Sequence, residues 1–289
     1  MHHGAVIATE GGHVIDCAGC GYAHVDPLPG QSDLDALYTN AFYESDKPDY
    51  LAKTESERNY WRSVYFDRLN RIERLRDRGR ILDVGCSGGW FLECAVEHGW
   101  DALGIEPAPL AVEFARNKGL QVLESTYDRA PADIGRFDAI HAALVLEHLL
   151  DAGGFVRWAY RHLERGGLLC VETPNDFNRL QAVLHSNGFP QYWVAPDHHV
   201  NYFTFDSLEG LLESEGFDIV ARSAQFPMEL FLLLGYDYVA DPGIGPMCHT
   251  RRMEFESALR INDPDLLSGL YDALAALAIG REAVVYGVK

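Results

Sequence analysis

The sequence predicts an α/β fold, in which a Rossmann-like sheet of seven strands has helices on both faces, with an N-terminal leader and a helical insertion before the last strand. Three observations support this prediction. Short apolar runs alternate with helix-length amphipathic stretches between residues 80 and 173, a glycine-rich turn follows the first run, and a further apolar run lies close to the end of the sequence. Alternation at this spacing implies crossover connections and a parallel sheet that is covered on both faces.

Five strands of the sheet are expected at apolar runs that helix-length segments separate. The runs are 81–84, 102–105, 122–123, 137–140 and 167–171, and the helices between them cover 89–98, 110–118 and 154–163. Upstream, apolar residues at helical spacing predict one amphipathic helix over residues 54–77, packed beside the first strand. Ligands of such sheets bind beyond the carboxyl ends of the strands.

The rest of the chain predicts a helix at 206–215 and strands at 217–224 and 283–288. Between these strands, Asp263 and Pro264 mark the start of a further helix, and Gly280 marks its end. The predicted domains are a leader with a Cys-x-x-Cys pair and a short helix (1–49), a Rossmann-like domain (50–225), a helical lid that contacts substrate (226–280) and a final strand (281–289). Arg281 is expected to anchor the lid on a carboxylate beneath it.

The charge of the chain argues against several classes of partner. Lys and Arg number 24 and Asp and Glu number 43, which gives a formal net charge of −19. Such an acidic surface repels phosphate backbones and anionic lipid, so neither a nucleic acid nor a membrane surface is expected as partner. No apolar run approaches the roughly 20 residues that span a bilayer, and no secretion signal is recognised. We expect a cytoplasmic protein that binds a small molecule, with its state as monomer or homodimer left open.

The turn after the first strand carries the sharpest motif, Asp83-Val84-Gly85-Cys86-Ser87-Gly88-Gly89. Its glycines allow a tight turn and let a ligand approach main-chain amides. The spacing departs from the G-x-G-x-x-G pattern that seats a pyrophosphate, and the carboxylate of Asp83 favours an ammonium or sulfonium group over an anion. Glu106 lies 23 residues further on, at the end of the second strand, where an acidic side chain accepts both ribose hydroxyls. S-adenosylmethionine, an adenosine with a cationic amino-acid tail, fits both features.

Residues 80–224 resemble the class I S-adenosylmethionine-dependent methyltransferases. The resemblance rests on five segments in family order, which are I-L-D-V-G-C-S-G-G (81–89), G-I-E-P (104–107), F-D-A-I (137–140), V-L-E-H-L (145–149) and G-G-L-L-C-V-E-T-P-N (166–175). It implies S-adenosylmethionine as cofactor, with Asp83, Gly85 and Gly88 at the methionine end, Glu106 at the ribose, and Cys86, Pro107, Leu144 and Glu147 around it. Tyr43, in the leader, is expected either to close over the cofactor or to belong to a helix packed on the sheet. The residue that meets adenine stays open among residues 125–128.

The leader resembles that of a narrower subgroup of these enzymes, which act on sugars and other small metabolites and carry a small zinc ribbon. The resemblance rests on Asp16-Cys17-Ala18-Gly19-Cys20-Gly21, Asp26-Pro27-Leu28-Pro29, Leu37-Tyr38 and Phe42-Tyr43. A tetrahedral zinc site needs four ligands, usually two Cys-x-x-Cys pairs. Cys17 and Cys20 form the one pair present, so they are the candidate metal ligands, and zinc is not the favoured expectation. Further ligands stay open among His2, His3, His13 and His24.

Methyl transfer to an alcohol is an in-line displacement that a general base assists. The candidate bases are His199 and His198, in the segment D-H-H-V-N-Y-F after the fifth strand, and His148 after the fourth. The H-x-x-x-F pattern resembles an element of the same methyltransferase group, in which His199 has the recurring position. The residues expected to contact the acceptor are Asn175, Tyr202, Glu229, Tyr236, His249 and Arg251. For Arg251, a surface ion pair is the alternative.

The predicted function is methyl transfer from S-adenosylmethionine to a small-molecule acceptor, first of all to a hydroxyl of a sugar or natural-product intermediate, with a histidine as base. The alternatives left open are C- or N-methylation, an RNA or protein methyltransferase, and a catalytically silent partner protein that binds the cofactor. A polar cavity between the segment of His198 and His199 and the insertion would favour an enzyme over the silent alternative.

Overall fold

The computed structural model describes residues 2–8 and 13–289, including all their side chains except those of 33, 35–38, 40 and 41. Residues 1 and 9–12 of the predicted leader lie outside the described part. The strands of the central sheet are β4 (Arg80–Val84), β5 (Asp101–Glu106), β6 (Val122–Glu124), β7 (Phe137–Ala143), β8 (Leu163–Pro174), β10 (Asp218–Ala224) and β11 (Glu282–Val288).

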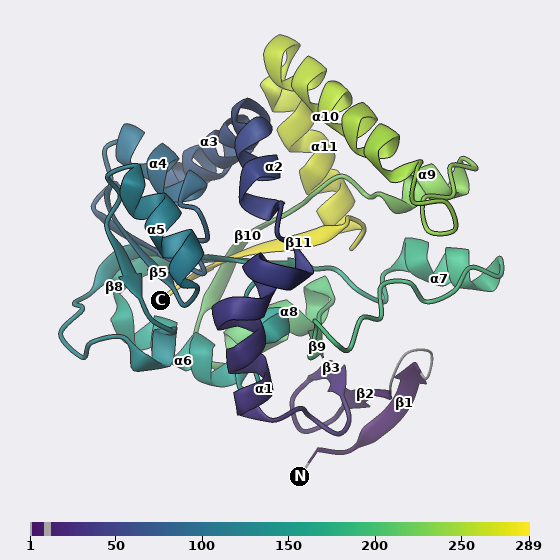
Figure 1. Cartoon of the computed structure of the whole chain (residues 1–289), viewed down its shortest axis with the longest axis horizontal. Coiled ribbons are helices and arrows are strands. Elements are labelled where there is room, and N and C mark those ends of the chain that lie inside the picture. The colour runs from purple at the N-terminus through teal and green to yellow at the C-terminus, as the bar shows by residue number, and fades with distance from the viewer. Residues whose placement is uncertain (1, 9–12) are drawn as a thin grey trace.

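These seven strands lie in the order β10-β11-β8-β7-β4-β5-β6 (Figure 1). The pairs that join β8, β7, β4, β5 and β6 are parallel, whereas β11 is antiparallel to both β8 and β10. The predicted fold class, a seven-stranded Rossmann-like sheet, is therefore confirmed. The chain continues from β4 to β5 on one side of the sheet and from β7 to β8 on the other, so the order of the strands reverses between the neighbours β4 and β7. Ligands of open α/β sheets bind beside such a reversal.

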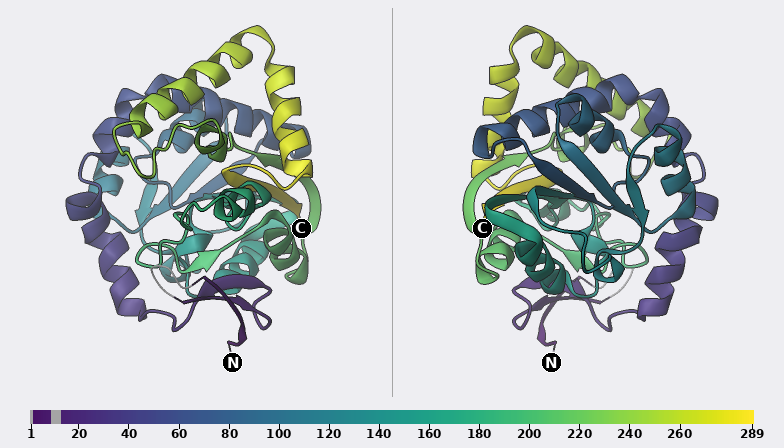
Figure 2. Two further views of the ribbon diagram at one scale, coloured as in Figure 1. Left: turned by 90° about the vertical axis from the view of Figure 1, so that its right-hand side faces the viewer. Right: turned by 90° about the vertical axis from the view of Figure 1, so that its left-hand side faces the viewer.

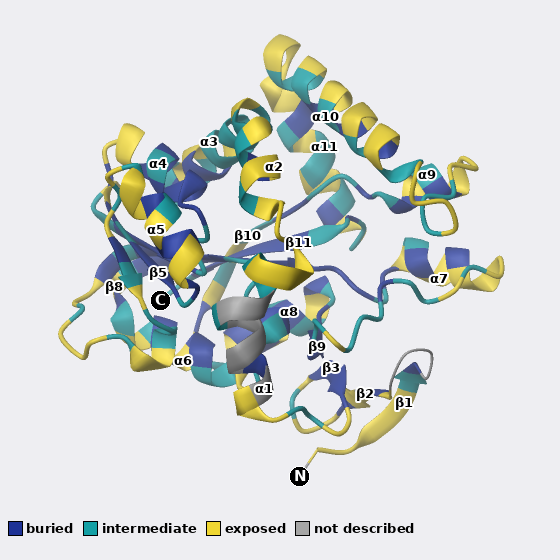
Figure 3. Ribbon diagram, viewed as in Figure 1, coloured by how far each residue is buried: buried dark blue, intermediate teal, exposed yellow. Residues whose placement is uncertain are grey.

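Helices cover both faces of this sheet. One face packs against α3 (Arg58–Leu75), α4 (Trp90–Glu97) and α5 (Pro109–Asn117), and the other against α6 (Ala152–His162) and α8 (Phe205–Ser214). Successive residues of β4 point to opposite faces, so Ile81 joins the core under α3 and Leu82 joins the core under α6. Figure 3 shows the result, a buried sheet between helices whose outer surfaces are exposed.

The single helix predicted over residues 54–77 is instead two helices, α2 (Tyr50–Ser56) and α3. They meet at Glu57, which has φ −98° and ψ 11°. The carboxylate of Glu57 accepts a hydrogen bond from Trp61 Nε1 at 3.1 Å and lies 3.1 Å from Nε2 of His249 in the insertion. The break thus serves a contact with a distant part of the chain, which helical periodicity cannot reveal.

The leader forms a second, smaller sheet. Its strands β1 (Gly4–Ala8), β2 (Val14–Cys17) and β3 (Tyr22–Val25) are antiparallel, and β9 (Asn201–Tyr202) pairs with β3 as the fourth strand. A short helix α1 (Gln31–Ala36) and a π-helix η1 (Leu37–Asp46) then lead to α2. The β3–β9 pairing joins the leader to the segment that carries the predicted histidines.

The insertion consists of α9 (Glu229–Leu233), α10 (Gly245–Asn262) and α11 (Pro264–Ala276). Asp263 caps α11, as predicted, because its carboxylate accepts a hydrogen bond from Leu266 N at 3.0 Å. The insertion packs on α3, where Arg260 pairs with Asp67 at 2.6 Å, and it lies at the opposite end of the molecule from β1–β3 (Figures 1 and 2).

Three shorter elements complete the described chain, α7 (Arg179–Ser186), η2 (Tyr127–Arg129) and η3 (Leu146–His148). The sequence patterns do not predict α7, which a capping box at Asn178 begins. Within residues 2–8 and 13–289, no helix has both the length and the apolar character to cross a membrane.

Candidate active site

Backbone conformation marks one edge of the central sheet. Among residues 2–8 and 13–289, four non-glycine residues have a left-handed φ, namely Ser87 (50°), Leu144 (55°), Phe177 (56°) and Ala278 (55°). The first three closely follow the carboxyl ends of β4, β7 and β8, and Ala278 precedes β11, whose first residue pairs with the last residue of β8. Side chains make this region of φ costly, and residues held there gather at functional sites. The same edge is the one at which such sheets bind ligands.

The glycine turn after β4 is formed by backbone alone. Gly85 has φ 73°, and a Cβ at this position would lie 2.7 Å from Cγ2 of Val145. The amides of Gly85 and Cys86 donate to the carbonyl of Ile105 at 2.8 and 3.2 Å, which ties the turn to β5. At Gly88 a Cβ would lie 2.6 Å from the Trp90 ring. Residues with side chains cannot replace these glycines without moving the turn.

Glu106 ends β5 beside this turn, with its carboxylate held in place. The side chain is 5% exposed and accepts two backbone hydrogen bonds. One comes from Ser87 N in the glycine turn at 2.9 Å, and the other comes from Ala108 N, just after Pro107, at 3.0 Å. Burial raises the pKa of Glu106 to about 7; the two amides oppose this rise, and the nearby carboxylate of Asp83 adds to it. A carboxylate fixed in this way can accept hydrogen bonds from two neighbouring hydroxyls.

Asp83 lies beneath the turn and already has a partner that the sequence analysis missed. Its Oδ1 is 2.7 Å from Nδ1 of His141, the residue opposite Asp83 in the β4–β7 register. The His141 ring stacks on Phe91 with ring centres 3.8 Å apart, and its Nε2 is 3.3 Å from Nη1 of Arg68. One carboxylate oxygen of Asp83 is therefore engaged by His141, and the predicted contact of Asp83 with the cationic end of the ligand stays a prediction. A lone histidine within the apolar strand F-D-A-I-H-A-A is the signal that could have revealed it.

Tyr43 and Leu144 complete the surroundings of the turn. The hydroxyl of Tyr43, on η1, is 2.8 Å from Oγ of Ser87, and burial raises the pKa of Tyr43. Leu144 is 46% exposed although it is apolar. A backbone turn, a fixed carboxylate, an exposed apolar side chain and a tyrosine hydroxyl fit an adenosine that carries an amino-acid tail. These residues would hold S-adenosylmethionine.

A second group of polar side chains is buried near the ends of β8 and β11. We refer to three acidic side chains and one neighbouring arginine as the buried acidic cluster; they are Glu147, Asp176, Glu229 and Arg281. Each of its three carboxyl groups is at most 1% exposed and has one oxygen without a hydrogen-bond partner in the described part of the chain. Burial raises the pKa of Glu147 well above its usual range and that of Asp176 to about 7. Buried polar atoms normally have partners, so these atoms indicate a place for a polar ligand.

Arg281 is the cation of this cluster, and its Nη1 lies 3.9 Å from Oδ1 of Asp176. A carboxylate therefore lies beneath Arg281, as predicted. Glu229, which begins α9 of the insertion, accepts a hydrogen bond from Gln181 Nε2 of α7 at 3.1 Å. The cluster therefore joins the insertion to the edge of the sheet.

Two of the three predicted histidines adjoin this cluster. Nδ1 of His199 is buried and lacks a hydrogen-bond partner among the described residues. His148 donates from Nδ1 to the carbonyl of His198 at 2.9 Å, so its Nε2 is an acceptor, and this atom lies 3.8 Å from Oε1 of Glu147. Donor atoms of Glu147, His148 and His199 all lie within 4.8 Å of one another, so one small group can reach all three.

The charge states of these histidines follow from their burial. Burial lowers the pKa of His148 to about 4, and burial together with the neighbouring His148 lowers the pKa of His199 to about 3. Both imidazoles are therefore neutral at pH 7 and able to accept a proton. His198 is instead 42% exposed and lies 3.8 Å from Asp46, at the surface.

Two of the residues predicted to contact the acceptor make hydrogen bonds that hold the edge of the sheet. Asn175 is fully buried, and its Nδ2 donates to the carbonyls of Ala278 and Gly280 at 3.2 and 3.1 Å, which fixes the chain ahead of β11. Tyr202 is 2% exposed, and its hydroxyl accepts from Ala195 N at 3.1 Å. Both side chains shape the edge of the sheet from within.

Three other predicted acceptor contacts lie on the insertion and are engaged elsewhere. Tyr236 is 45% exposed, and His249 pairs with Glu57 between α2 and α3. Arg251 lies on the surface of α10, where it pairs with Glu254 at 2.8 Å, so the surface alternative describes it. Of the insertion residues predicted to contact the acceptor, Glu229 is the one that belongs to the buried acidic cluster.

The predicted metal pair, Cys17 and Cys20, lies in the leader sheet. Ligand atoms of His2 and His24 join the two thiols, and all four atoms lie within 4.8 Å of one another. The sequence spacing gives no reason to select these two histidines among the four open alternatives. The folding of β1 and β3 beside β2 selects them.

Comparison with known proteins gives consistent matches. Residues 57–222, more than half of the chain, match the family model described as "Methyltransferase domain". The curated protein named "Ubiquinone biosynthesis O-methyltransferase" from Methylocella silvestris is 37% identical over 102 residues, which are 33% of this chain and 40% of that protein. This chain thus spans about two fifths of the length of that relative.

Two solved structures share the fold. A SAM-dependent methyltransferase from Archaeoglobus fulgidus has a TM-score of 0.52 at 18% identity and covers 79% of this chain and 94% of its own. The plantazolicin methyltransferase BpumL, solved in complex with SAH, has a TM-score of 0.54 at 14% identity and covers 89% of this chain and 94% of its own. At such identities the likeness concerns the fold.

Proposed function

Because this chain belongs to the class I S-adenosylmethionine-dependent methyltransferases, whose methyl donor is S-adenosylmethionine, we propose that it methylates a hydroxyl of a small polyhydroxylated acceptor, such as a sugar or natural-product intermediate. The observation that carries the proposal is the buried acidic cluster. Its three carboxyl groups each have an oxygen without a partner in the described part of the chain, and ligand atoms of Glu147 and of two neutral histidines lie within 4.8 Å of one another. The printed name of the curated relative, an O-methyltransferase, gives separate support.

The chemistry divides between the two groups of residues. Bound S-adenosylmethionine supplies a methyl group activated by a sulfonium. Glu106, the glycine turn and Tyr43 orient the donor side. On the acceptor side, Nδ1 of His199 accepts the proton of the hydroxyl as its oxygen forms the new bond to carbon and the carbon–sulfur bond breaks. A neutral imidazole without another partner suits this role, and positioned bases of this kind contribute about 10²- to 10⁴-fold to rate.

The class of acceptor follows from what the cluster leaves unsatisfied. Three carboxyl groups each present one oxygen without a partner, and Arg281 presents a donor. A molecule with several hydroxyls satisfies such a set, since hydroxyls both donate and accept hydrogen bonds. An amine would satisfy the carboxylates but not Arg281, and a carbon acceptor without polar groups would leave all these atoms unpaired.

Methyl-labelled S-adenosylmethionine tests the proposal with the full chain. Sugars and glycosides, other polyols, catechols and amines are offered separately, the release of S-adenosylhomocysteine is measured, and the labelled product is assigned by NMR. We expect a methyl ether on a polyhydroxylated acceptor. A product methylated at nitrogen or carbon contradicts the choice of acceptor atom. Tight binding of S-adenosylhomocysteine without turnover of any acceptor favours the silent partner protein instead.

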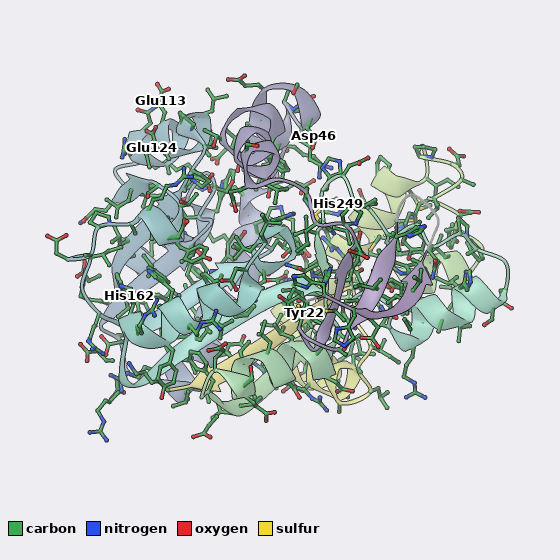
Figure 4. The ribbon with its side chains drawn as sticks, turned by 90° about the horizontal axis from the view of Figure 1, so that it is seen from below. Tyr22, Asp46, Glu113, Glu124, His162 and His249 are labelled. Carbon is green, nitrogen blue, oxygen red and sulfur yellow. The ribbon has the colours of Figure 1, made fainter. Side chains whose placement is uncertain are left out.

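A matched pair of histidine variants tests the base. We expect His199→Gln to lower kcat by roughly 10²- to 10⁴-fold without changing the Kd of S-adenosylhomocysteine. His162→Gln is the control, because His162 lies on α6, stacks on Trp158 and is well separated from Tyr22 and the leader (Figure 4). Equal kcat values for the two variants would remove His199 from the proposed mechanism.

A further inference from the structure

The leader brings four side chains together that commonly bind metal, and we propose that His2, Cys17, Cys20 and His24 form a structural zinc site. Cys17 ends β2, Cys20 lies in the turn that follows, His24 belongs to β3, and His2 precedes β1. Their ligand atoms lie within 4.8 Å of one another. Two histidines thus supply what a second Cys-x-x-Cys pair supplies in a four-cysteine site.

The distances between these atoms suit one tetrahedral ion. Nδ1 of His2 lies 3.4 Å from Sγ of Cys20 and 3.8 Å from Sγ of Cys17. In tetrahedral zinc sites with Zn–S of about 2.3 Å and Zn–N of about 2.0–2.1 Å, a nitrogen and a sulfur ligand are about 3.6 Å apart. The two observed separations bracket this value.

His24 has the hydrogen-bonding pattern of a metal ligand. Its Nδ1 donates to the carbonyl of Val25 at 2.7 Å, which makes Nε2 the unprotonated nitrogen. This Nε2 is buried and has no hydrogen-bond partner in residues 2–8 and 13–289. Metal-binding histidines usually donate their other N–H to a carbonyl or carboxylate in this way. A metal ion would satisfy the orphaned nitrogen.

The turn between the cysteines presents both thiols to the same region. The amides of Cys20 and Gly21 donate to the carbonyl of Cys17 at 3.2 and 2.9 Å, and Gly21 has φ 77°. A Cβ on Gly21 would meet nothing within 4 Å, so conformation rather than space requires glycine here. Two thiolates and two imidazoles in tetrahedral geometry are a donor set typical of zinc.

The site lies next to the proposed acceptor side. In the β3–β9 pairing, His24 is opposite Asn201, which lies two residues after His199. Nδ2 of Asn201 donates to the carbonyls of Leu146 and Leu149 at 2.8 and 2.6 Å, on either side of His148. Because four protein ligands leave zinc no open position, the ion acts by holding the leader and β9 together and does not take part in the chemistry.

Metal analysis of the full chain tests the site. The protein is purified with a C-terminal tag that contains no histidine, dialysed, and assayed for metals by mass spectrometry. We expect about one zinc per chain in the wild type, and zinc near background in Cys17→Ser and His24→Gln. His13→Gln is the matched control, because His13 is an exposed leader histidine outside the cluster. Cobalt in place of zinc should give the absorption of a tetrahedral thiolate site, and Cys20→Ser should abolish it.

The outcomes that would overturn the proposal are distinct from failure of the enzymatic one. Folded wild-type protein without zinc, or equal zinc in wild type and His24→Gln, contradicts the site. A Cys17–Cys20 disulfide in zinc-free protein assigns the pair to thiol redox chemistry instead. Removal of zinc with a chelator is expected to lower the thermal midpoint and leave the Kd of S-adenosylhomocysteine unchanged, since Glu106 and the glycine turn belong to the other sheet. Loss of S-adenosylhomocysteine binding would contradict this local role.

Discussion

Replacement of Glu106 by glutamine should weaken the binding of S-adenosylhomocysteine and also remove its dependence on pH. The carboxylate is 5% exposed and is held by the amides of Ser87 and Ala108. In the proposed mode it accepts hydrogen bonds from both ribose hydroxyls. An amide of the same shape keeps one acceptor oxygen but presents N–H groups where the second hydroxyl donates. The substitution therefore changes hydrogen bonding and charge, with little change in volume.

The size of the effect follows from the hydrogen bonds lost. A hydrogen bond to a charged group contributes about 1.5–3 kcal/mol, so loss of one at pH 8 should raise Kd roughly 10- to 150-fold at 1.4 kcal/mol per factor of ten. The pH dependence follows from the pKa of Glu106, which burial raises to about 7. Because only the ionised carboxylate accepts both hydroxyls, wild-type affinity should fall as pH drops through 7, by about tenfold between pH 8 and pH 6.

Calorimetric titration of S-adenosylhomocysteine across this pH range measures both effects. The matched control is Glu124→Gln, since Glu124 pairs with Glu106 in the β5–β6 register but is exposed, and Figure 4 labels it near the surface. Glu124→Gln should bind as the wild type does at every pH. A wild-type Kd that is constant between pH 6 and 8, or a Glu106→Gln profile as steep as that of the wild type, would refute the reasoning.

Three further predictions concern the turn, its support and the base. Gly85→Ala should weaken S-adenosylhomocysteine binding at least about tenfold, because its Cβ would lie 2.7 Å from Cγ2 of Val145 and displace the turn; Gly99→Ala, which carries the same left-handed backbone cost of about 1–2 kcal/mol but has open space, should lose stability and bind normally. His141→Phe should lower the free energy of unfolding by about 2–3 kcal/mol in urea titration, since it leaves the buried carboxylate of Asp83 without its hydrogen bond; unchanged stability would contradict this pairing. At saturating donor, kcat should stay constant as the pH falls from 8 to 5, because burial lowers the pKa of His199 to about 3 and the imidazole stays neutral over this range. A decline of kcat centred near pH 6.5 would contradict this prediction.

The central sheet could be predicted from the sequence because local pattern and buried position agree there. Parallel strands that are covered on both faces consist of continuous apolar runs, as in 81–84 and 167–171, and their crossovers fix which runs are neighbours. The start of α11 at Asp263 and Pro264 could be predicted because a helix cap is a local signal. Glu106 and Gly85 are found by spacing, since their roles depend on the ends of particular strands.

What could not be predicted depends on partners far apart in the chain. The bond of His141 to Asp83 follows from the register of β7 on β4, and the choice of His2 and His24 follows from how three leader strands fold together. Asn175 illustrates the reverse case. Its position after β8 predicts contact with a ligand, and the chain before β11 accepts two hydrogen bonds from its Nδ2, while its Oδ1 has no partner in the described part of the chain. The periodicity of apolar residues along the chain carries no information about these contacts between distant residues.

The non-glycine residues with a left-handed φ at the edge of the sheet imply a conflict between the stability of the fold and its activity. Leu144 and Phe177 could be glycine without backbone cost, and each instead holds a conformation that costs on the order of 1–3 kcal/mol. Selection for thermal stability alone would place glycine at both positions. Leu144 instead presents an exposed apolar side chain beside the turn, and Phe177 packs its ring against Trp193 and Tyr202, so glycine would remove both of these side chains in exchange for a more robust fold. Engineering for heat resistance should therefore leave these two positions untouched and look to the outer helices.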